Sequence, residues 1–479
     1  MKIISNQEIQ SPEIVLDENH LEIDNQEKQK KNPRFVSKKI WIIRAIVIWG
    51  ISFFMFYNFI IAWMVADPLI LFSTLMSLHI LTVFVVGWVF FKNRATGFVP
   101  QDLASVIIPV FNQENLIADV IKAVLNSSYQ NIEIIAVNDG SRDNTGEILD
   151  KLACIHSRVT VIHKKNGGKR TAVATGFYSS HGKYIVLIDS DSIIDSKAIE
   201  EFMKAFSANP KVGGVVGNCK VLNADKNFLT KCQDAWYDYA FNIHKTTEST
   251  FGTVLCCSGC LAAYRREAIS RFIPFWEKYT VQNSDDRDLT SYVMASSWAK
   301  EDLAPFSLDL MKEMAKYDDS EDRGLTAQAL MEWETVYIPS AVVHTEVPEQ
   351  PKAYLRQQTR WKKGYVRSCF FVSAFFWKKH PLMALIFYLE FMSTFLGPLV
   401  IFAVYFYAPF ILGIFWIPLT YSLGQILIGL AAGLDYRFRE PKVKNWKYKP
   451  LMNMMASFVL PWLLIPALWT YKKNRWMTR

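Results

Sequence analysis

Two long apolar blocks, at 40–91 and 381–471, limit what this chain can fold into more than any other feature. Runs such as IWIIRAIVIWGISFFMFYNFIIAWMVA exceed the roughly 20 residues that a helix needs to cross the hydrocarbon core of a bilayer. The sequence at 100–350, between the blocks, has the mixed polar and apolar texture of a globular domain. The chain is therefore expected to combine a membrane-spanning part with at least one domain folded outside the lipid.

Breaks inside the apolar blocks predict how the helices are divided. Asp67 and Pro68 split the first block into two spans, and Pro461 and Pro466 allow the last segment to bend into a re-entrant hairpin instead of crossing. The expected organisation is a disordered cytoplasmic tail (1–39), two transmembrane helices (40–92), a cytosolic globular domain (100–348), amphipathic interface helices (349–380), two transmembrane helices (381–434), a basic cytoplasmic loop (435–450), and a last transmembrane or re-entrant helix with a basic tail (451–479).

The distribution of charge points to a membrane surface. The formal net charge is only +8, and Lys and Arg crowd beside the apolar blocks, as in KQKKNPRFVSKK and RFREPKVKNWKYK. This placement is typical of the cytoplasmic side of a membrane. No basic stripe interleaved with aromatic residues is present, so we expect the lipid bilayer, and not nucleic acid, as a partner.

The middle of the chain alternates short β-branched runs with helix-like segments. The runs ASVIIPVFN, IEIIAVND, KYIVLIDSD and VGGVVGN predict strands. Helices are predicted at 113–126, 143–155, 169–180 and 196–208. This alternation predicts an α/β domain with a mostly parallel sheet flanked by helices on both faces. Ligands of such sheets bind beyond the carboxyl ends of the strands.

Acidic residues follow two of these predicted strands. Asp139 ends IIAVND, and Asp189 and Asp191 end IVLIDSD. Two carboxylates so close together repel each other unless they share a cation, and hard divalent ions prefer oxygen ligands. The pattern predicts Mg²⁺ or Mn²⁺ bridging a diphosphate.

Two further segments suit a phosphate and a sugar. KKNGGKRTAVATG places Lys169 and Arg170 at a helix start after a glycine pair, where anions bind well. In QQTRW, Gln357, Arg360 and Trp361 share one helical face. Arg matches a diphosphate, and an indole stacks on a sugar ring.

Seven motifs in order, IIPVFNQE, VNDGS, NGGKR, DSD, SGCLAAYRR, EDRGLT and QQTRW, resemble the processive family-two inverting glycosyltransferases of the GT-A type. Within that family the chain is most similar to hyaluronan synthases, chitin synthases and nodulation chitooligosaccharide synthases. The resemblance covers about 100–365 and implies a plasma-membrane enzyme that builds a polysaccharide from UDP-sugars and extrudes it. The alternative is a non-processive transferase that moves one sugar onto a polyprenyl phosphate or another lipid acceptor.

The resemblance also implies roles for individual residues. The uridine would be contacted by Asp139 and Glu114. A divalent metal on Asp189 and Asp191, with Lys169, would hold the diphosphate. The acceptor sugar would be bordered by Ser258, Gly259 and Cys260, ahead of a helix. The diphosphate would be covered by Gln357, Arg360 and Trp361, which would also form the floor of the acceptor site.

The catalytic base is expected in one of two similar segments, NSDDRDLTSYVM and DDSEDRGLTAQAL. Each offers a carboxylate, at Asp286 and Asp322, that could take the proton from the acceptor hydroxyl. We favour Asp322, because the segment that follows it runs without an insertion into QQTRW. Asp286 is the second candidate, because it lies nearer SGCLAAYRR and its segment resembles the hyaluronan synthase motif.

One acidic residue interrupts the second apolar block. Glu390, in FYLEFMSTF, would be costly in lipid unless it faced water or a partner. Two interpretations are open: Glu390 lines a polar path for the polymer, or it pairs with another side chain. For His79, in the first block, an interhelical hydrogen bond is the preferred interpretation.

Overall fold

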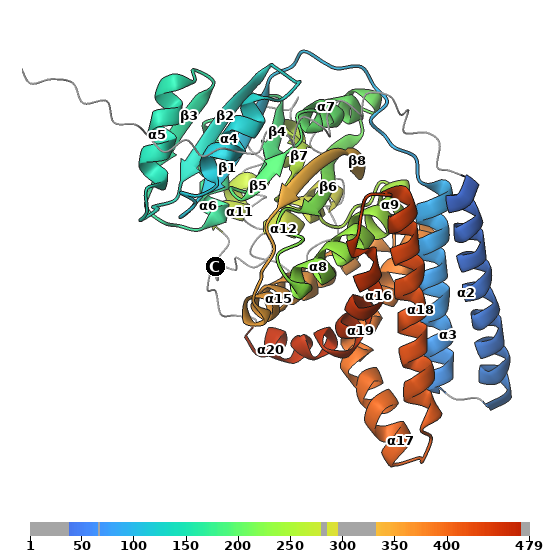
Figure 1. Cartoon of the computed structure of the whole chain (residues 1–479). Helices are drawn as coiled ribbons and strands as arrows, with labels where there is room; N and C mark the ends of the chain where they lie inside the picture. The colour runs from blue at the N-terminus through green and yellow to red at the C-terminus, as the bar shows by residue number, and fades with distance from the viewer. Residues whose placement is uncertain (1–37, 66–67, 279–284, 296–331, 471–479) are drawn as a thin grey trace, which may run out of the picture.

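The computed structural model describes residues 38–65, 68–278, 285–295 and 332–470. Within these residues a globular α/β part sits against a bundle of long helices (Figure 1). Almost all of the predicted cytoplasmic tail and the basic end of the chain lie outside the described residues. The division into a membrane part and a globular part follows the two apolar blocks of the sequence.

Within the described residues the globular part is built on an eight-stranded sheet in the order β3-β2-β1-β4-β7-β6-β8-β5. Strands β3, β2, β1 and β4 are parallel, β7 runs antiparallel between β4 and β6, β6 and β8 are parallel, and β5 pairs antiparallel with β8. The strands are β1 (Ala104–Val110), β2 (Ile132–Asn138), β3 (Val159–His163), β4 (Tyr184–Leu187), β5 (Ser192–Ile194), β6 (Val212–Val221), β7 (Ala262–Arg265) and β8 (Glu334–Thr345).

The four helices predicted between the first strands are all present, and each begins within a few residues of its predicted start. In α4 the side chains of Ile117, Val120, Ile121 and Val124 are completely buried, as expected where apolar residues recur at helical spacing. The prediction of a GT-A type, mostly parallel sheet flanked by helices and joined to a helical membrane part is confirmed. These helices are α4 (Ile117–Leu125), α5 (Thr145–Ile155), α6 (Lys169–Tyr178) and α7 (Ala198–Ala208).

The segment after Ser258–Cys260 differs from the sequence expectation. It leads into strand β7, whose four residues are buried, and not directly into a helix. A short apolar run such as LAAYR fits either structure, and pairing on both sides with β4 and β6 selects the strand. The short helix α10 (Arg266–Ile269) comes only after it.

The membrane part contains three helices, among the described residues, that are long and apolar enough to span a bilayer, or four if a pair bent by 45° is one span. The three cover Lys39–Tyr57, Pro381–Phe410 and Trp416–Arg439, and a shorter apolar helix covers Thr74–Phe90. The helices involved are α2 (Lys38–Val65), α3 (Pro68–Val85), α16 (Pro381–Phe402), α17 (Ala408–Phe410) and α18 (Trp416–Arg439).

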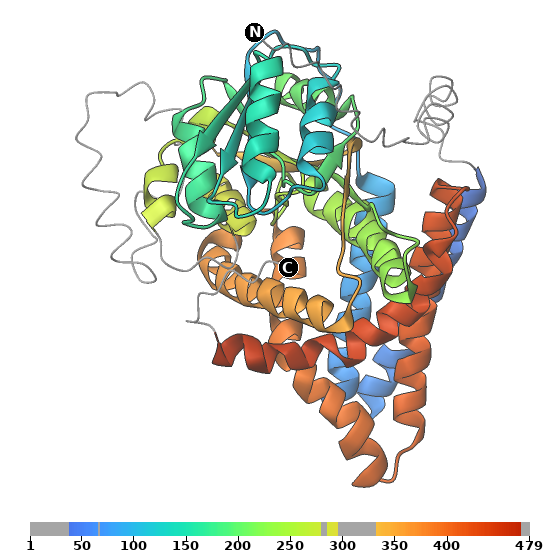
Figure 2. The ribbon, with the colours of Figure 1, turned by 60° about the vertical axis from the view of Figure 1, so that its left-hand side comes forward.

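Three further helices lie between the two parts. α15 (Pro351–Phe376) carries the QQTRW motif, and α20 (Leu464–Trp469) packs against it. Figure 2 shows α20 running across the direction of α18. The bend between α19 (Lys449–Phe458) and α20 is compatible with both predicted alternatives, a broken span and a re-entrant helix.

Candidate functional site

The candidate site lies where parallel strands end at one edge of the sheet. Strand β2 leads directly into Asp139, Asp189 is the second residue after strand β4, and the first residue of α6 is Lys169. Helix α12 (Asp285–Ala295) brings the first copy of the repeated acidic motif to the same edge. Residues more than 100 positions apart in the chain therefore meet here, as expected for this class of sheet.

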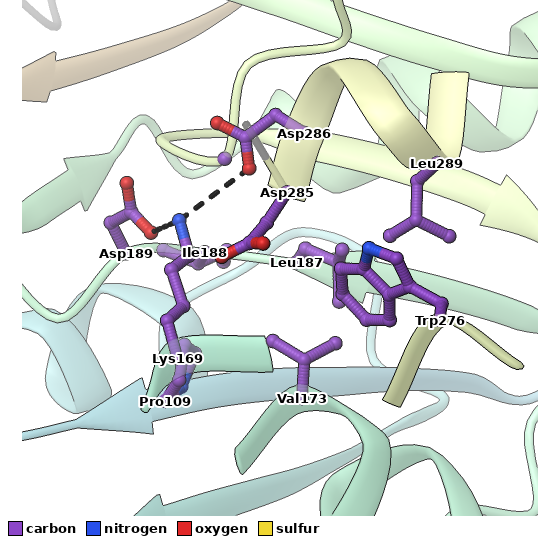
Figure 3. A pocket seen from close by; sticks show the side chains of 11 residues that line it. Pro109, Lys169, Val173, Leu187, Ile188, Asp189, Trp276, Asp285, Asp286 and Leu289 are labelled. Carbon is purple, nitrogen blue, oxygen red and sulfur yellow. Dashed lines mark ion pairs between the residues drawn. The ribbon is translucent and has the colours of Figure 1, made fainter. Parts of the chain in front are cut away.

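Lys169 lies at the centre of this site, between two carboxylates. Its Nζ is 2.5 Å from Asp189 Oδ1 and 3.5 Å from Asp286 Oδ1 (Figure 3). The side chains of Asp189 and Asp286 are about one-third exposed, at 32% and 33%. One lysine is thus shared by two acids that remain open to a ligand.

Gly259 makes this convergence sterically feasible. A Cβ at this position would lie 2.5 Å from Lys169 Nζ and 2.7 Å from Asp286 Oδ1. Side chains do not tolerate such distances, so a larger residue would push the lysine or the aspartate away. The sequence prediction placed Gly259 at the acceptor sugar, and the structure brings it to the charged cluster itself.

The charges of the cluster perturb one another. Burial lowers the pKa of Lys169, but the carboxylates of Asp189 and Asp286 outweigh burial and raise it above its ordinary value. Burial, together with repulsion from Asp286 and Asp191 and against the effect of Lys169, raises the pKa of Asp189. The acids outnumber the lysine, so the site would gain from a further cation.

Asp189 and Asp191 fit a divalent metal by their chemistry. Asp191 Oδ1 accepts hydrogen bonds from Ser192 and Thr345 and is half-buried beside the cluster. In the described part of the chain no group of three or more His, Cys, Asp or Glu is arranged to hold a metal by itself. The two carboxylates would supply part of a shell of oxygen ligands, and diphosphate oxygens would complete it.

The two residues predicted to contact uridine are engaged with neighbouring loops. Asp139 is buried, and its carboxylate accepts hydrogen bonds from Lys164 Nζ and from the backbone N–H groups of Gly167 and Gly168. Glu114 Oε2 accepts from the N–H of Asn144 at 3.0 Å. Asp139 thus holds the glycine loop ahead of Lys169 in place.

The QQTRW residues lie on α15, and two of them carry unsatisfied polar atoms. Gln357 Oε1 and Arg360 Nε are buried and have no hydrogen-bond partner among the described residues. Trp361 is half-buried and stacks on Trp236 of α8 (Phe228–Tyr239), with ring centroids 6.0 Å apart. Buried polar atoms without partners are costly, so this face is suited to a polar ligand.

Of the two candidate bases, only one can be located. Asp322 lies outside the described residues, and its role stays a prediction. Asp286, the second candidate, stands beside Lys169 and Gly259 at the start of α12. Ser258 and Cys260 flank Gly259, and the side chain of Cys260 is buried.

Glu390 is paired within the membrane part. Its Oε1 lies 2.5 Å from His244 Nε2 of the π-helical turn η3 (Ala240–His244) and 3.3 Å from His79 Nε2 of α3. The structure thus shows the pairing interpretation, and His79 makes the interhelical contact expected of it. A contribution of Glu390 to a polymer path stays a prediction.

Several residues of this region were not singled out from the sequence as site residues. Asp285 and Asp288 bond Arg170, which was expected beside Lys169 at an anion-binding helix start but is completely buried. Trp236 belongs to none of the motifs. The DDRD segment contained the signal for Asp285 and Asp288, since acids three apart share a helix face, but the sequence does not show that Arg170 faces them.

Comparison with known proteins agrees with this arrangement. The glycosyl transferase family 2 profile matches residues 105–272. Hyaluronan synthase from Streptococcus pyogenes is 29% identical over 407 residues, covering 79% of this chain and 84% of that protein. An N-acetylglucosaminyltransferase from Azorhizobium caulinodans is 30% identical over 267 residues, covering 55% of this chain and 59% of that protein.

A solved structure supports the fold independently. A mannosyltransferase from Pyrobaculum calidifontis, in complex with GDP-Man and Mn²⁺, aligns with a TM-score of 0.51 at 17% identity, over 84% of this chain and 99% of that chain. The sheet topology, the strand-end acids and the sequence relatives lead to one family. Residues 105–272 form a family-two glycosyltransferase domain, so the chain is a hexosyltransferase, and it is similar to hyaluronan synthases and N-acetylglucosaminyltransferases.

Proposed function

We propose that the protein is a membrane-embedded processive β-glycosyltransferase. It polymerises an N-acetylglucosamine-containing, hyaluronan- or chitin-like polysaccharide from UDP-sugars by inverting transfer, and it extrudes the product. The observation that carries the proposal is the convergence of Lys169, Asp189 and Asp286 around Gly259 at the strand ends. The similarity to hyaluronan synthase over most of both chains supports the type of product.

The donor diphosphate is assigned to the side of this cluster that carries Lys169 and the two proposed metal ligands, Asp189 and Asp191. Lys169 would pair with a phosphate oxygen, and Asp189 and Asp191 would hold Mg²⁺ or Mn²⁺, which neutralises charge on the leaving UDP. The glycine loop held by Asp139, together with Glu114, borders the region assigned to uridine. Because the Lys169 ammonium group contacts both Asp189 and Asp286, it can give up one of these contacts to bind a phosphate oxygen and keep the other.

We assign the base to Asp286. Inverting transfer needs a carboxylate that takes the proton of the acceptor hydroxyl on the face opposite to the departing UDP. Asp286 faces Asp189 across Lys169, so the base and the diphosphate side lie on two sides of one ammonium group (Figure 3). Asp286 is also one-third exposed, as a group that meets a substrate must be.

The acceptor is assigned to α15 and the turn at Ser258–Cys260. Gln357 Oε1 and Arg360 Nε need partners that hydroxyl or phosphate oxygens can supply. Trp361 offers an indole to the receiving sugar, and its stacking on Trp236 keeps it from turning away. After each transfer the new terminal sugar would occupy the same platform, which is what processive synthesis requires.

The membrane part is assigned to export. A polar polymer does not cross hydrocarbon unaided, so we assign its path to the bundle formed by the spans, with the catalytic part on the cytoplasmic side of the plasma membrane. The basic segments beside the apolar blocks support this orientation.

Product analysis tests the proposal. Purified protein in lipid vesicles is incubated with Mn²⁺ and radiolabelled UDP-N-acetylglucosamine, with and without UDP-glucuronic acid, and the products are sized on a gel and digested with chitinase or hyaluronidase. The proposal expects long chains sensitive to one of these hydrolases. A product of one sugar on a lipid would establish the non-processive alternative, and no UDP release from either donor would reject both.

A further inference from the structure

A buried ion-pair cluster joins the three helices that carry the proposed chemistry. Arg170, on α6, donates to Asp285 Oδ1 from both Nε and Nη2, at 2.9 and 2.6 Å. Its Nη2 also donates to Asp288 Oδ2 at 2.9 Å. Asp288 Oδ2 in turn accepts from Arg367 Nη2, on α15, at 2.8 Å. Asp288 is therefore the point where α6, α12 and α15 are tied together.

The cluster is built for rigidity. Arg170 is completely buried, and the side chains of Asp288 and Arg367 are 8% and 15% exposed. The guanidinium of Arg170 also lies 5.2 Å from the ring centroid of Trp276 and donates to its carbonyl oxygen. Among the described residues, its two cations, Arg170 and Arg367, face two acids, Asp285 and Asp288. Removing one partner of a buried, charge-assisted hydrogen bond is costly, so such bonds constrain the spacing of the helices that they join.

The helical spacing explains how this cluster can aim the proposed base. Asp285 and Asp288 are three residues apart, so they share one face of α12 and both face Arg170. Asp286 lies about 100° around the helix from Asp285, which directs it to Lys169 instead. Figure 3 shows these two neighbours leaving the first turn of α12 in different directions. Fixing the first pair fixes the rotation of the helix, and hence the position of Asp286.

We propose that Asp288 is a positioning residue, which through Arg170 and Arg367 holds the base Asp286 in register with the donor-binding start of α6 and the acceptor-binding helix α15. The inference rests on the proposed function, since it assigns Asp288 an effect on the base named there. Asp288 touches neither the substrate nor the reacting atoms. It acts by keeping the helices α6, α12 and α15 at fixed distances from one another.

The membrane part offers a matched control. Asp435, on α18, is completely buried and likewise lies between two arginines, with Arg44 Nε at 2.8 Å and Arg439 Nε at 2.6 Å. None of the three belongs to the Lys169 cluster or to the QQTRW face. Replacing Asp435 by Asn thus removes the same kind of buried ion pair without touching the proposed positioning.

The experiment compares Asp288→Asn with Asp435→Asn by kcat, by the KM for the UDP-sugar and by Tm. Asp288→Asn is expected to lower kcat by about 10- to 100-fold with little change in the donor KM, because displacement of a catalytic group by about 1 Å can cost 100-fold. Asp435→Asn is expected to lower Tm while kcat stays within about twofold. Equal kcat losses in the two variants, or an unchanged kcat in Asp288→Asn, would overturn the proposal.

A double variant separates positioning from stability and covers the case in which Asp288→Asn folds poorly. Asp288→Asn/Arg367→Gln removes both charges, so no buried ion is left unpaired and Tm is expected to recover. The ion pair between Asp288 of α12 and Arg367 of α15 is still absent in this variant, so kcat is expected to remain low. Recovery of kcat together with Tm would show that Asp288 is only structural. Failure of the proposed function would look different, because the wild-type protein would then release no UDP from either donor, and failure of the base assignment alone would leave Asp286→Asn at the wild-type rate.

Discussion

Two groups of buried and half-buried charge in this molecule both combine aspartates with basic side chains, and they differ in how completely they are paired. Around Lys169, a single ammonium group faces Asp189 and Asp286, both about one-third exposed. Around Asp435, two arginines bond this completely buried carboxylate, and one of them, Arg439, also bonds Asp238, so that two cations face two acids among the described residues. The first group lacks positive charge and is open, whereas the second is balanced and closed.

This difference separates a binding site, around Lys169, from a structural contact between helices, around Asp435. A closed and balanced ion pair has no further partner to gain, so its effect is to hold α2 and α18 together where the membrane part meets the globular part. An open group that lacks a cation gains when a phosphate-bound metal arrives. The ionisable residues of this chain can thus be divided into those of a binding site and those of a structural contact by their pairing and exposure. The predictions below test that division.

Replacing the proposed base should give the largest effect. Asp286→Asn is expected to reduce transfer by about 100- to 10,000-fold, the usual contribution of general base catalysis, while donor binding is kept. UDP release at saturating donor measures the rate, and equilibrium binding of UDP measures the retained affinity. Asp322→Asn is the comparison, and it is expected to keep substantial turnover. If Asp322→Asn is inactive and Asp286→Asn is active, the base belongs to the second copy of the motif.

Removal of divalent metal should come next. Chelation by EDTA is expected to abolish UDP release, and added Mg²⁺ or Mn²⁺ should restore it, because the anionic Asp189 and Asp191 repel the diphosphate unless a divalent cation lies between them. Asp191→Asn should raise the metal concentration needed for half-maximal activity. Full activity in EDTA would mean that Lys169 supplies the only cation of the open group.

Filling the space at Gly259 should have an intermediate effect. Gly259→Ala is expected to lower kcat by roughly 100-fold, since its Cβ would meet Lys169 Nζ and Asp286 Oδ1 at 2.5 and 2.7 Å and displace a catalytic group by about 1 Å. Gly424, in α18, is the matched control, because a Cβ added there would meet no neighbouring atom within 4 Å. Comparable kcat values in Gly259→Ala and Gly424→Ala would contradict the tight convergence.

A paired acid of the membrane part should give the smallest effect on chemistry. Glu390→Gln keeps a hydrogen-bonding side chain but removes the charge that faces His244 and His79. The Tm is expected to fall by roughly 2–4 °C for each kcal/mol lost in a domain of 150–250 residues, with UDP release unchanged. Comparing UDP release with export of the polymer from vesicles checks this. Loss of export with normal UDP release would instead place Glu390 on the polymer path.

Much of the fold followed from local pattern. Alternating β-branched runs and amphipathic segments predicted β1, β2, β4, β6 and the four helices between the strands, because those elements bury faces that repeat with the period of a strand or a helix. The antiparallel strand β7 was missed, since pairing partners, and not its own short sequence, determine its structure. A local sequence pattern carries no information on which distant strands a segment will pair with.

The site was predictable to a similar depth. The strand-end acids and Lys169 could be expected at one edge of the sheet, and the structure brings Asp189 and Lys169 together. The sequence did not reveal that Gly259 lies against Asp286, or that Arg170 and Arg367 meet on Asp288. The two contacts on Asp288 join segments about 80 to 120 residues apart, and only the folded chain determines such distances.

Calorimetric binding of UDP to the purified protein tests the central claim most directly, because every assignment above depends on a metal-assisted diphosphate at the Lys169 cluster. UDP should bind wild type and Asp286→Asn with similar affinity in Mn²⁺, and binding should weaken at least tenfold in EDTA and in Lys169→Ala. If wild type binds no UDP in the presence of Mn²⁺, or if binding is indifferent to Lys169, the open group of charges is not the donor site.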